Sequence, residues 1–289
     1  MTDSTASRAM RVDAHQHFWT PGAFDYPWME GTALDPVRRP FLPEDLEPAL
    51  QRNRIDATVL VQTVSDLAET VGFLELARQV PFVAGVVGWV DLTSPAVGET
   101  IDELIAEYGP LLVGIRHQVH DEGDENWLER PSVQRGLAAL ARRGLRFDLL
   151  VRTRELPTAV RTVARFPELR FVLDHVAKPR VGTGWDADWS AALAPLSALP
   201  NVSVKLSGLV TEAHWDSWNS DTLHPYIART LELFGAERAM FGSDWPVCLL
   251  AAKDYDSVLE ALSVNLRLLS GTEREAILGT NAMEFYGLG

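Results

Sequence analysis

Arg11-Val12-Asp13-Ala14-His15-Gln16-His17 is the first apolar run of the chain, and it ends in two histidines separated by one residue. Because successive side chains of a strand alternate between its faces, His15 and His17 point the same way, roughly 7 Å apart along the strand. Two imidazoles on one face can bind a single metal ion or a single reacting group. The alternative is a pair of surface or structural histidines. The polar residues that end later strands favour a site.

Seven further short apolar runs follow in the 289-residue chain. They are nearly continuous in Val, Ile, Leu and Phe, as in parallel strands that are buried on both faces. The predicted strands cover residues 11–17, 57–64, 82–90, 111–117, 145–151, 170–175, 202–205 and 239–244. Amphipathic segments between them predict helices over 94–108, 132–143, 154–166, 188–199, 221–234, 255–270 and 272–285. Ser94 is the predicted N-cap of the first of these helices, and Thr272 with Glu275 forms a predicted capping box in the last.

Eight strands, each followed by a helix, predict an α/β protein of the (β/α)8 TIM-barrel type, because parallel strands need crossover connections of about a dozen residues. No linker-like stretch divides the chain, which predicts a flexible tail over residues 1–10 and a single barrel over 11–289. A doubly wound sheet is the alternative fold. It is disfavoured because no Gly-x-Gly-x-x-Gly follows an early strand.

The composition of the chain excludes some classes of binding partner. The formal charge of −14 disfavours nucleic acid and anionic membrane surfaces as partners. No apolar run reaches the ~18–20 residues of a transmembrane helix, and the first ten residues lack the apolar centre of a secretion signal. The single cysteine, Cys248, excludes an intrachain disulfide, and its expected role is that of a small buried hydrophobe. These features predict a cytoplasmic protein, and the oligomeric state stays open.

Polar residues end the predicted strands, which in a barrel bring distant segments to one rim. They are His15, His17, Arg116, His117, Asp174, His175, Lys205 and Asp244. A carboxylate such as Asp244 beside histidines can bind a metal or accept a proton from water, whereas its structural alternative is a turn residue before Pro246. His175 is a further nitrogen ligand or an acid–base group, and alternatively a core histidine bonded to the backbone.

Arg116 presents a planar fork of donors that suits a carbonyl or carboxylate oxygen. A structural ion pair with Asp148, which lies inside the fifth apolar run, is the competing interpretation. Lys178 and Lys205 are weaker candidates of the same kind. Surface roles are expected for the histidines in loops or at a helix start, His120, His214 and His224.

Eight tryptophans fall in segments that follow strands and are predicted to lie near the rim: Trp19, Trp28, Trp127, Trp185, Trp189, Trp215, Trp218 and Trp245. Aromatic faces beside polar groups suit a polyhydroxy compound or a planar ring, although packing of loop aromatics explains part of the set. The segment 19–41 is longer than a plain connection needs and is a candidate cover for the pocket.

Five motifs, taken together, resemble one superfamily: His15-x-His17, Gly114-Ile115-Arg116-His117, Asp174-His175-x-Ala177-Lys178-Pro179, Lys205-Leu206-Ser207-Gly208 and Gly242-Ser243-Asp244-Trp245-Pro246. The chain resembles the amidohydrolase superfamily, and within it the amidohydrolase-2 branch of TIM-barrel hydrolases. The most similar sub-branch contains L-fuconolactonase, L-rhamnonolactonase and 2-pyrone-4,6-dicarboxylate lactonase. The similarity runs from about Arg11 to the end of the chain.

The resemblance implies a hydrolase of carbohydrate catabolism that opens a lactone, a cyclic carboxylic ester. It makes His15, His17, His175 and Asp244 the metal ligands for a divalent ion, with zinc expected, and makes Asp244 and His175 catalytic. Arg116, His117, Trp19, Lys178 and Trp245 are expected to bind substrate. Many metal-bearing relatives also have a histidine at the end of the fifth strand, where residues 146–151 have none. Catalysis without metal therefore stays open.

The expected reaction is attack of an activated water on the lactone carbonyl, with Asp244 as the base. The first rival is a metal-dependent nonoxidative decarboxylase of the same branch; such relatives usually keep the fifth-strand histidine. The second rival is a barrel that binds a sugar acid without turnover, which the complete set of His15, His17, His175 and Asp244 disfavours. The identity and stereochemistry of the lactone are not readable from the sequence.

Overall fold

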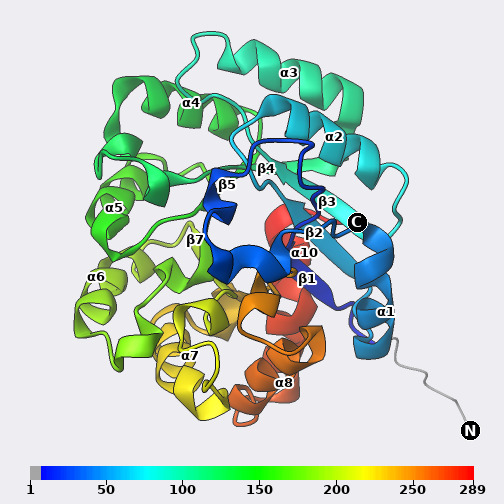
Figure 1. Ribbon diagram of the computed structural model, residues 1–289. Coiled ribbons are helices and arrows are strands. Elements are labelled where there is room, and N and C mark those ends of the chain that lie inside the picture. The colour runs from blue at the N-terminus through cyan, green and yellow to red at the C-terminus, as the bar shows by residue number, and fades with distance from the viewer. Residues whose placement is uncertain (1–7) are drawn as a thin grey trace, which may run out of the picture.

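Eight parallel strands form the centre of the computed structural model, which describes residues 8–289 (Figure 1). Each strand pairs with the next along the chain, in the order β1 to β8. The strands are β1 Val12–Gln16, β2 Ala57–Val61, β3 Val83–Gly88, β4 Leu112–His117, β5 Arg146–Leu149, β6 Phe171–Leu173, β7 Val202–Leu206 and β8 Ala239–Phe241. The predicted (β/α)8 barrel is confirmed, although several strands are shorter than their apolar runs.

The barrel closes between β1 and the segment that follows β8. The backbone N–H of Asp244 donates to the carbonyl of His15 at 2.9 Å, and the N–H of His17 donates to the carbonyl of Trp245 at 2.7 Å. Asp13 strengthens the seam, because its Oδ1 accepts the N–H of Ser243 at 2.9 Å. This closure brings Asp244 against the two histidines of the first strand, although they are far apart in the sequence.

Helices surround the strands (Figure 1). They are α1 Pro43–Asn53, α2 Leu67–Ala77, α3 Val97–Tyr108, α4 Pro131–Arg142, α5 Leu156–Arg165, α6 Ala187–Ser197, α7 Ser220–Phe234, α8 Tyr255–Asn265, α9 Gly271–Glu275 and α10 Asn281–Tyr286. The helices α1 and α2 were not among the predicted segments. A π-helical turn, Ala276–Thr280, joins α9 to α10, so the predicted helix over 272–285 is in fact three pieces.

Two predicted helix starts are wrong by two residues. Ser94 is not the N-cap of α3, which begins after Ala96; the Ser94 hydroxyl instead accepts the N–H of Ala96 at 3.1 Å. The capping box of α9 uses Ser270 and Glu273, not Thr272 and Glu275. In both cases the backbone turn, and not the presence of a Ser or Thr nearby, decides which residue is the N-cap: Ala96 for α3 and Ser270 for α9.

The last helix, α10, fills one end of the barrel interior, and in Figure 1 it appears in red at the centre of the ring. Its buried Phe285 and Tyr286 pack on small and branched residues of the strands. These include Val12, Ala14, Val59, Val61, Val87, Val113, Val172 and Met240. Tyr286 also donates a hydrogen bond from its hydroxyl to Asp148 at 2.8 Å, which connects this apolar plug to the polar interior above it.

The segment between β1 and α1 folds back over the barrel instead of forming an open loop. Trp19 and Phe41 exchange backbone hydrogen bonds at 3.1 and 2.9 Å, and the indole N–H of Trp19 donates to the carbonyl of Val37 at 3.0 Å. Arg38 binds the carbonyls of Met29 and Gly31 at 2.6 and 2.7 Å. We refer to residues 19–41 as the covering segment.

Of the predicted tail, residues 1–7 lie outside the described residues. Arg8 forms two hydrogen bonds with Asp56, at 2.7 and 2.9 Å. Among the residues that the structure describes, no helix has the length and apolar character needed to cross a membrane.

Candidate active site

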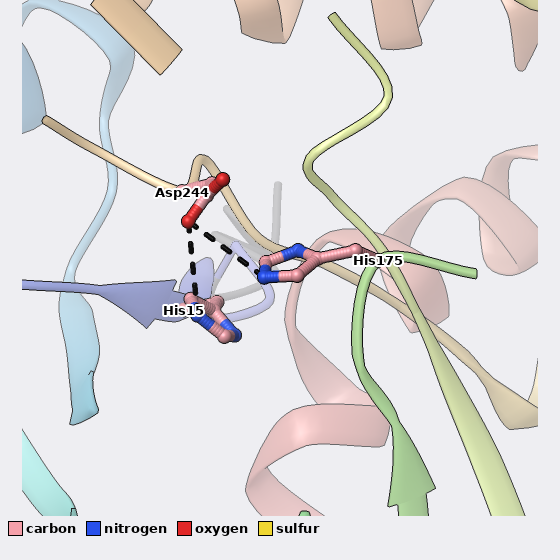
Figure 2. A group of neighbouring side chains, drawn as sticks. All are labelled: His15, His175 and Asp244. Atoms are coloured by element: carbon pink, nitrogen blue, oxygen red, sulfur yellow. Dashed lines mark ion pairs between the residues drawn. The ribbon is translucent and has the colours of Figure 1, made fainter. Parts of the chain in front are cut away.

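Three histidines and one aspartate meet at the carboxyl ends of the strands. His15 lies in β1, and His17 is the first residue after that strand. His175 lies in the turn after β6, and Asp244 follows β8. Figure 2 shows His15, His175 and Asp244, whose ligand atoms all lie within 4.8 Å of one another. The Asp244 Oδ1 lies 3.4 Å from the Nε2 of His17 and 3.8 Å from the Nε2 of both His15 and His175. The four residues therefore form one cluster.

Hydrogen bonds on the far side of two rings orient this cluster. The Nδ1 of His17 lies 2.7 Å from the carbonyl of Val61, and because a carbonyl only accepts, this nitrogen carries the proton. The Nε2 of His17 is then a lone-pair donor. The Nδ1 of His175 is 2.9 Å from the hydroxyl of Ser207, and this contact orients the second ring.

The spacing and charge of the cluster fit a divalent metal ion. The Nε2 atoms of His15 and His17 are only 3.2 Å apart. Two nitrogens bound tetrahedrally to zinc at 2.0–2.1 Å would be about 3.3 Å apart. Burial lowers the pKa of His15, His17 and His175, so the rings are neutral and their lone pairs are available. Converging lone pairs and a carboxylate call for a cation between them.

Strained backbone holds two of these residues in place. His175 has φ +52° and starts a run of four left-handed residues that ends at Lys178, and Asp244 has φ +57°. Such conformations cost of order 1–3 kcal/mol each and concentrate at functional sites. Gly208 is required beside them, because a Cβ there would lie 2.5 Å from the Nδ1 of His175.

A buried network of charges lies directly beneath the histidines. Lys205 is completely buried and lies 2.6 Å from Asp148 and 3.0 Å from Asp174. Asp174 also pairs with Arg116 at 3.0 Å and lies 3.4 Å from the Nδ1 of His15. Burial opposes its ionisation, but Lys205, His15 and Arg116 outweigh burial and hold the pKa of Asp174 well below its ordinary value. The network therefore keeps a negative charge behind His15.

This pairing corrects one interpretation of the sequence. Arg116 does not pair with Asp148; its partner is Asp174, and Asp148 binds Lys205. The remaining nitrogen of the Arg116 fork reaches Gln62, whose Oε1 lies at 3.1 Å. Lys205 was considered a weak site candidate and is in fact the central cation of the network.

All members of the cluster except the fully buried His15 line the floor of a cavity of about 430 Å³. His17, Arg116, His175 and Asp244 line its base. The polar wall consists of Thr63, Gln118, His120, Asp121, Arg152, Lys178, Thr211 and Glu212. The apolar wall consists of Trp28, Leu34, Leu150, Trp215, Val247 and Leu250. Trp28 and Leu34 belong to the covering segment, so this segment does overlie the site as the sequence indicated.

Three of the residues expected to bind substrate lie away from this cavity. His117 stacks on Trp127 with ring centroids 4.0 Å apart, and its Nε2 lies 2.8 Å from Glu122. Trp19 and Trp245 are buried and pack edge-on against Phe41. Arg116 and His117 are neighbours in one strand, so they point to opposite sides and only Arg116 faces the cavity.

Lys178 does line the cavity, where it forms an ion pair with Glu212 at 3.1 Å. Four of the polar wall residues that sequence reasoning missed are Gln118, His120, Arg152 and Glu212. His120 had been assigned to the surface. The available signal was position, because all four follow the ends of β4, β5 or β7, where a barrel gathers its binding groups.

Cys248 is buried close to the site, and burial raises the pKa of its thiol well above the ordinary value. We expect no reaction of the native protein with an aromatic disulfide reagent over minutes, because thiolate and access are both lacking. After unfolding in urea, one thiol per chain should react. Rapid reaction of the native protein would contradict the packing described here.

The comparisons with known proteins agree with this geometry. The family model described as amidohydrolase matches residues 12–288. The L-fucono-1,5-lactonase of Burkholderia ambifaria is 40% identical over 281 residues, covering 96% of this chain and 95% of that protein. The L-fucono-1,5-lactonase of Burkholderia multivorans is 41% identical and covers 97% of both.

A crystal structure of an amidohydrolase from Burkholderia multivorans with bound zinc is 40% identical, with a TM-score of 0.91, and covers 97% of this chain and all of that one. The zinc in this relative and the donor set here together support a divalent metal ion. The 2,6-dihydroxybenzoate decarboxylase from Rhizobium is only 14% identical, with a TM-score of 0.67, and so shares the fold alone.

Proposed function

The chain belongs to the amidohydrolase family, and from that premise we propose that it is a lactonase that opens the ring of a sugar-acid lactone with the help of a bound zinc ion. The observation that carries the proposal is the convergence of His15, His17, His175 and Asp244, the last three of which line an open cavity. The similarity to two L-fucono-1,5-lactonases over almost their full length supports the class of substrate.

His15, His17, His175 and Asp244 would hold the ion, because their donor atoms converge with spacings of 3.2–3.8 Å for the pairs that contact one another. Zinc would supply a water of lowered pKa and polarisation of the lactone carbonyl. Arg116 lies beside these four residues, and its positive charge offsets the negative charge of Asp174.

Asp244 is the proposed base. Its carboxylate is nearly buried but lines the cavity, so one face reaches a substrate. Asp244 takes a proton from water as the water oxygen bonds to the carbonyl carbon. The bond from this carbon to the ring oxygen then breaks, and Asp244 returns the proton to that oxygen. The product is an open hydroxy acid.

The other cavity residues bind and orient the lactone. Arg116 faces the developing negative charge of the carbonyl oxygen from the floor. Lys178 and Glu212, held together at 3.1 Å, offer a donor and an acceptor for ring hydroxyls. Leu34 and Leu250 provide apolar contact for the carbon side of the sugar.

Proton release measures the reaction directly, because the product acid ionises at neutral pH. The protein should be mixed with L-fucono-1,5-lactone and a panel of other aldonolactones in a weakly buffered indicator solution. We expect rapid acidification with one stereochemical group of lactones. If no lactone of the panel causes acidification and the protein releases CO₂ from aromatic or unsaturated acids, the protein is a decarboxylase and the lactonase proposal is wrong.

Removal of metal should lower turnover at least about tenfold, because the metal supplies the activated water. The protein is dialysed against a chelator, its metal content measured, and zinc added back to restore activity. As a readout besides activity, zinc should raise the thermal midpoint of the depleted protein. The matched variant His15→Asn should lose this rise. Full turnover by the metal-depleted protein would show that zinc is not needed. The proposed lactonase activity would then still stand.

A further inference from the structure

A second cavity, of about 720 Å³, adjoins the first. Both cavities have Trp28, Gln118 and Asp121 in their walls. A molecule bound over Asp244 can therefore extend past these three side chains. We refer to the second space as the outer cavity; its remaining walls come from the covering segment, from the loop after β2 and from the loop after β4.

The outer cavity offers polar groups that the protein does not use for its own structure. Within residues 8–289, the structure records no hydrogen bond from the side chains of Asp25, Ser65 or Gln118. Other polar groups of the wall are engaged: Glu122 binds His117, and Asp66 caps α2. A carboxylate, a hydroxyl and a primary amide thus remain as free acceptors and donors.

Aromatic side chains provide the apolar part of the wall. Phe24 and Trp28 line the cavity, and both are half-buried. The Trp28 ring is held edge-on by Trp19, with centroids 5.3 Å apart and planes at 78°, so its orientation is fixed. A rigid aromatic face beside hydroxyl-binding groups suits a sugar ring, which presents C–H bonds on its face and hydroxyls at its edge.

The charge of the wall selects against anions. Four carboxylates, those of Asp25, Asp66, Asp121 and Glu122, line the outer cavity, and no lysine or arginine of the described part of the chain does. A carboxylate or phosphate on the ligand would be repelled. A neutral, polyhydroxylated unit is the chemistry that fits.

We propose that the outer cavity binds a second, neutral sugar unit, so that the substrates include aldonolactones that carry a glycosyl group. This inference rests on the proposed lactonase function and extends it to lactones that are larger by one sugar unit. A 1,5-lactone engages O5 in the ring and leaves O4 free for the glycosidic bond. The glycosidic bond stays intact, and the reaction remains opening of the lactone ring by water.

The test compares lactones with and without the second sugar. Glucono-1,5-lactone is compared with cellobiono-1,5-lactone and lactobiono-1,5-lactone by proton release, and L-fucono-1,5-lactone reports on the proposed function itself. We expect kcat/KM to be about tenfold higher with a glycosylated lactone than with glucono-1,5-lactone, mainly through a lower KM, as a few additional contacts would give.

Ser65→Trp fills the outer cavity from an exposed loop position that does not line the first cavity. It should abolish the advantage of the glycosylated lactones and leave turnover of L-fucono-1,5-lactone within about twofold. Thr272→Trp, exposed on α9, is the matched control and should change neither. If Ser65→Trp does not fold, Phe24→Ala serves, because it removes an aromatic wall and should reduce the advantage.

Equal kcat/KM for the plain and glycosylated lactones, while L-fucono-1,5-lactone is hydrolysed, would overturn the second sugar site and leave the lactonase intact. An advantage that survives Ser65→Trp would also overturn the site. If all four lactones are left unhydrolysed, the proposed function fails and the inference falls with it.

Discussion

Replacing Asp244 by Asn should lower kcat about 10³- to 10⁴-fold, because the amide can neither accept the proton of water nor return it to the ring oxygen. Asn has the same shape, and Asp244 makes its closest polar contacts to the histidines of the site. The free energy of unfolding should therefore change little, by about 1 kcal/mol or less. Steady-state kinetics by proton release and urea unfolding measure the two quantities.

Asp216→Asn is the matched control for this variant, since Asp216 is exposed and lines neither cavity. It makes the same change of charge and should retain full turnover. If Asp244→Asn kept a tenth of the wild-type kcat, another group would have to be the base.

Replacing Lys205 by Met should lower the free energy of unfolding by about 3–5 kcal/mol at pH 8, because two buried carboxylates lose their shared cation. Asp148 lies 2.6 Å and Asp174 lies 3.0 Å from the Lys205 ammonium, and all three side chains are completely buried. Met fills a similar volume, so loss of charge and not loss of packing dominates. Urea unfolding curves of wild type and variant give the difference.

The penalty should shrink as the pH falls toward 4. Burial raises the pKa of Asp148 even in the presence of Lys205, and removing the lysine raises it further. A carboxyl whose pKa is raised on folding favours the folded state below its unfolded pKa, and this contribution is lost as the pH rises through the folded pKa. A penalty that is equal at pH 4 and pH 8 would contradict this origin. Lys253→Met, at an exposed position, should be near neutral at both.

The barrel was predictable because its signal is local and repeated. Each buried parallel strand is a short run of apolar residues, and most crossovers, those of α1 and α2 excepted, were recognised as amphipathic segments, so the order of the strands follows from periodicity. The strand ends were harder to place. The sixth strand was predicted to reach His175 but ends at Leu173, because the backbone adopts left-handed conformations from His175 onward. The types of these side chains do not predict such a conformation.

The metal-type cluster was predictable for a related reason: strand ends in a barrel meet at one rim, so His15, His17, His175 and Asp244 had to be neighbours. Their partners were not predictable. Whether Asp148 or Asp174 accepts Arg116 depends on side-chain reach across the barrel, which the sequence does not contain. Alternation along the fourth strand, in contrast, already implied that Arg116 and His117 could not both face the cavity.

The plug formed by α10 has a consequence for how the protein is made. Tyr286 donates to the same carboxylate oxygen of Asp148 as Lys205, and Lys205 lies 3.1 Å from the Nδ1 of His15. The first strand of the barrel, β1, thus depends through these contacts on a residue of α10, which is translated after all eight strands. Nascent chains that are stalled before α10 should already pair many of their strands but remain catalytically silent. Activity should arise in a single step when the last helix emerges.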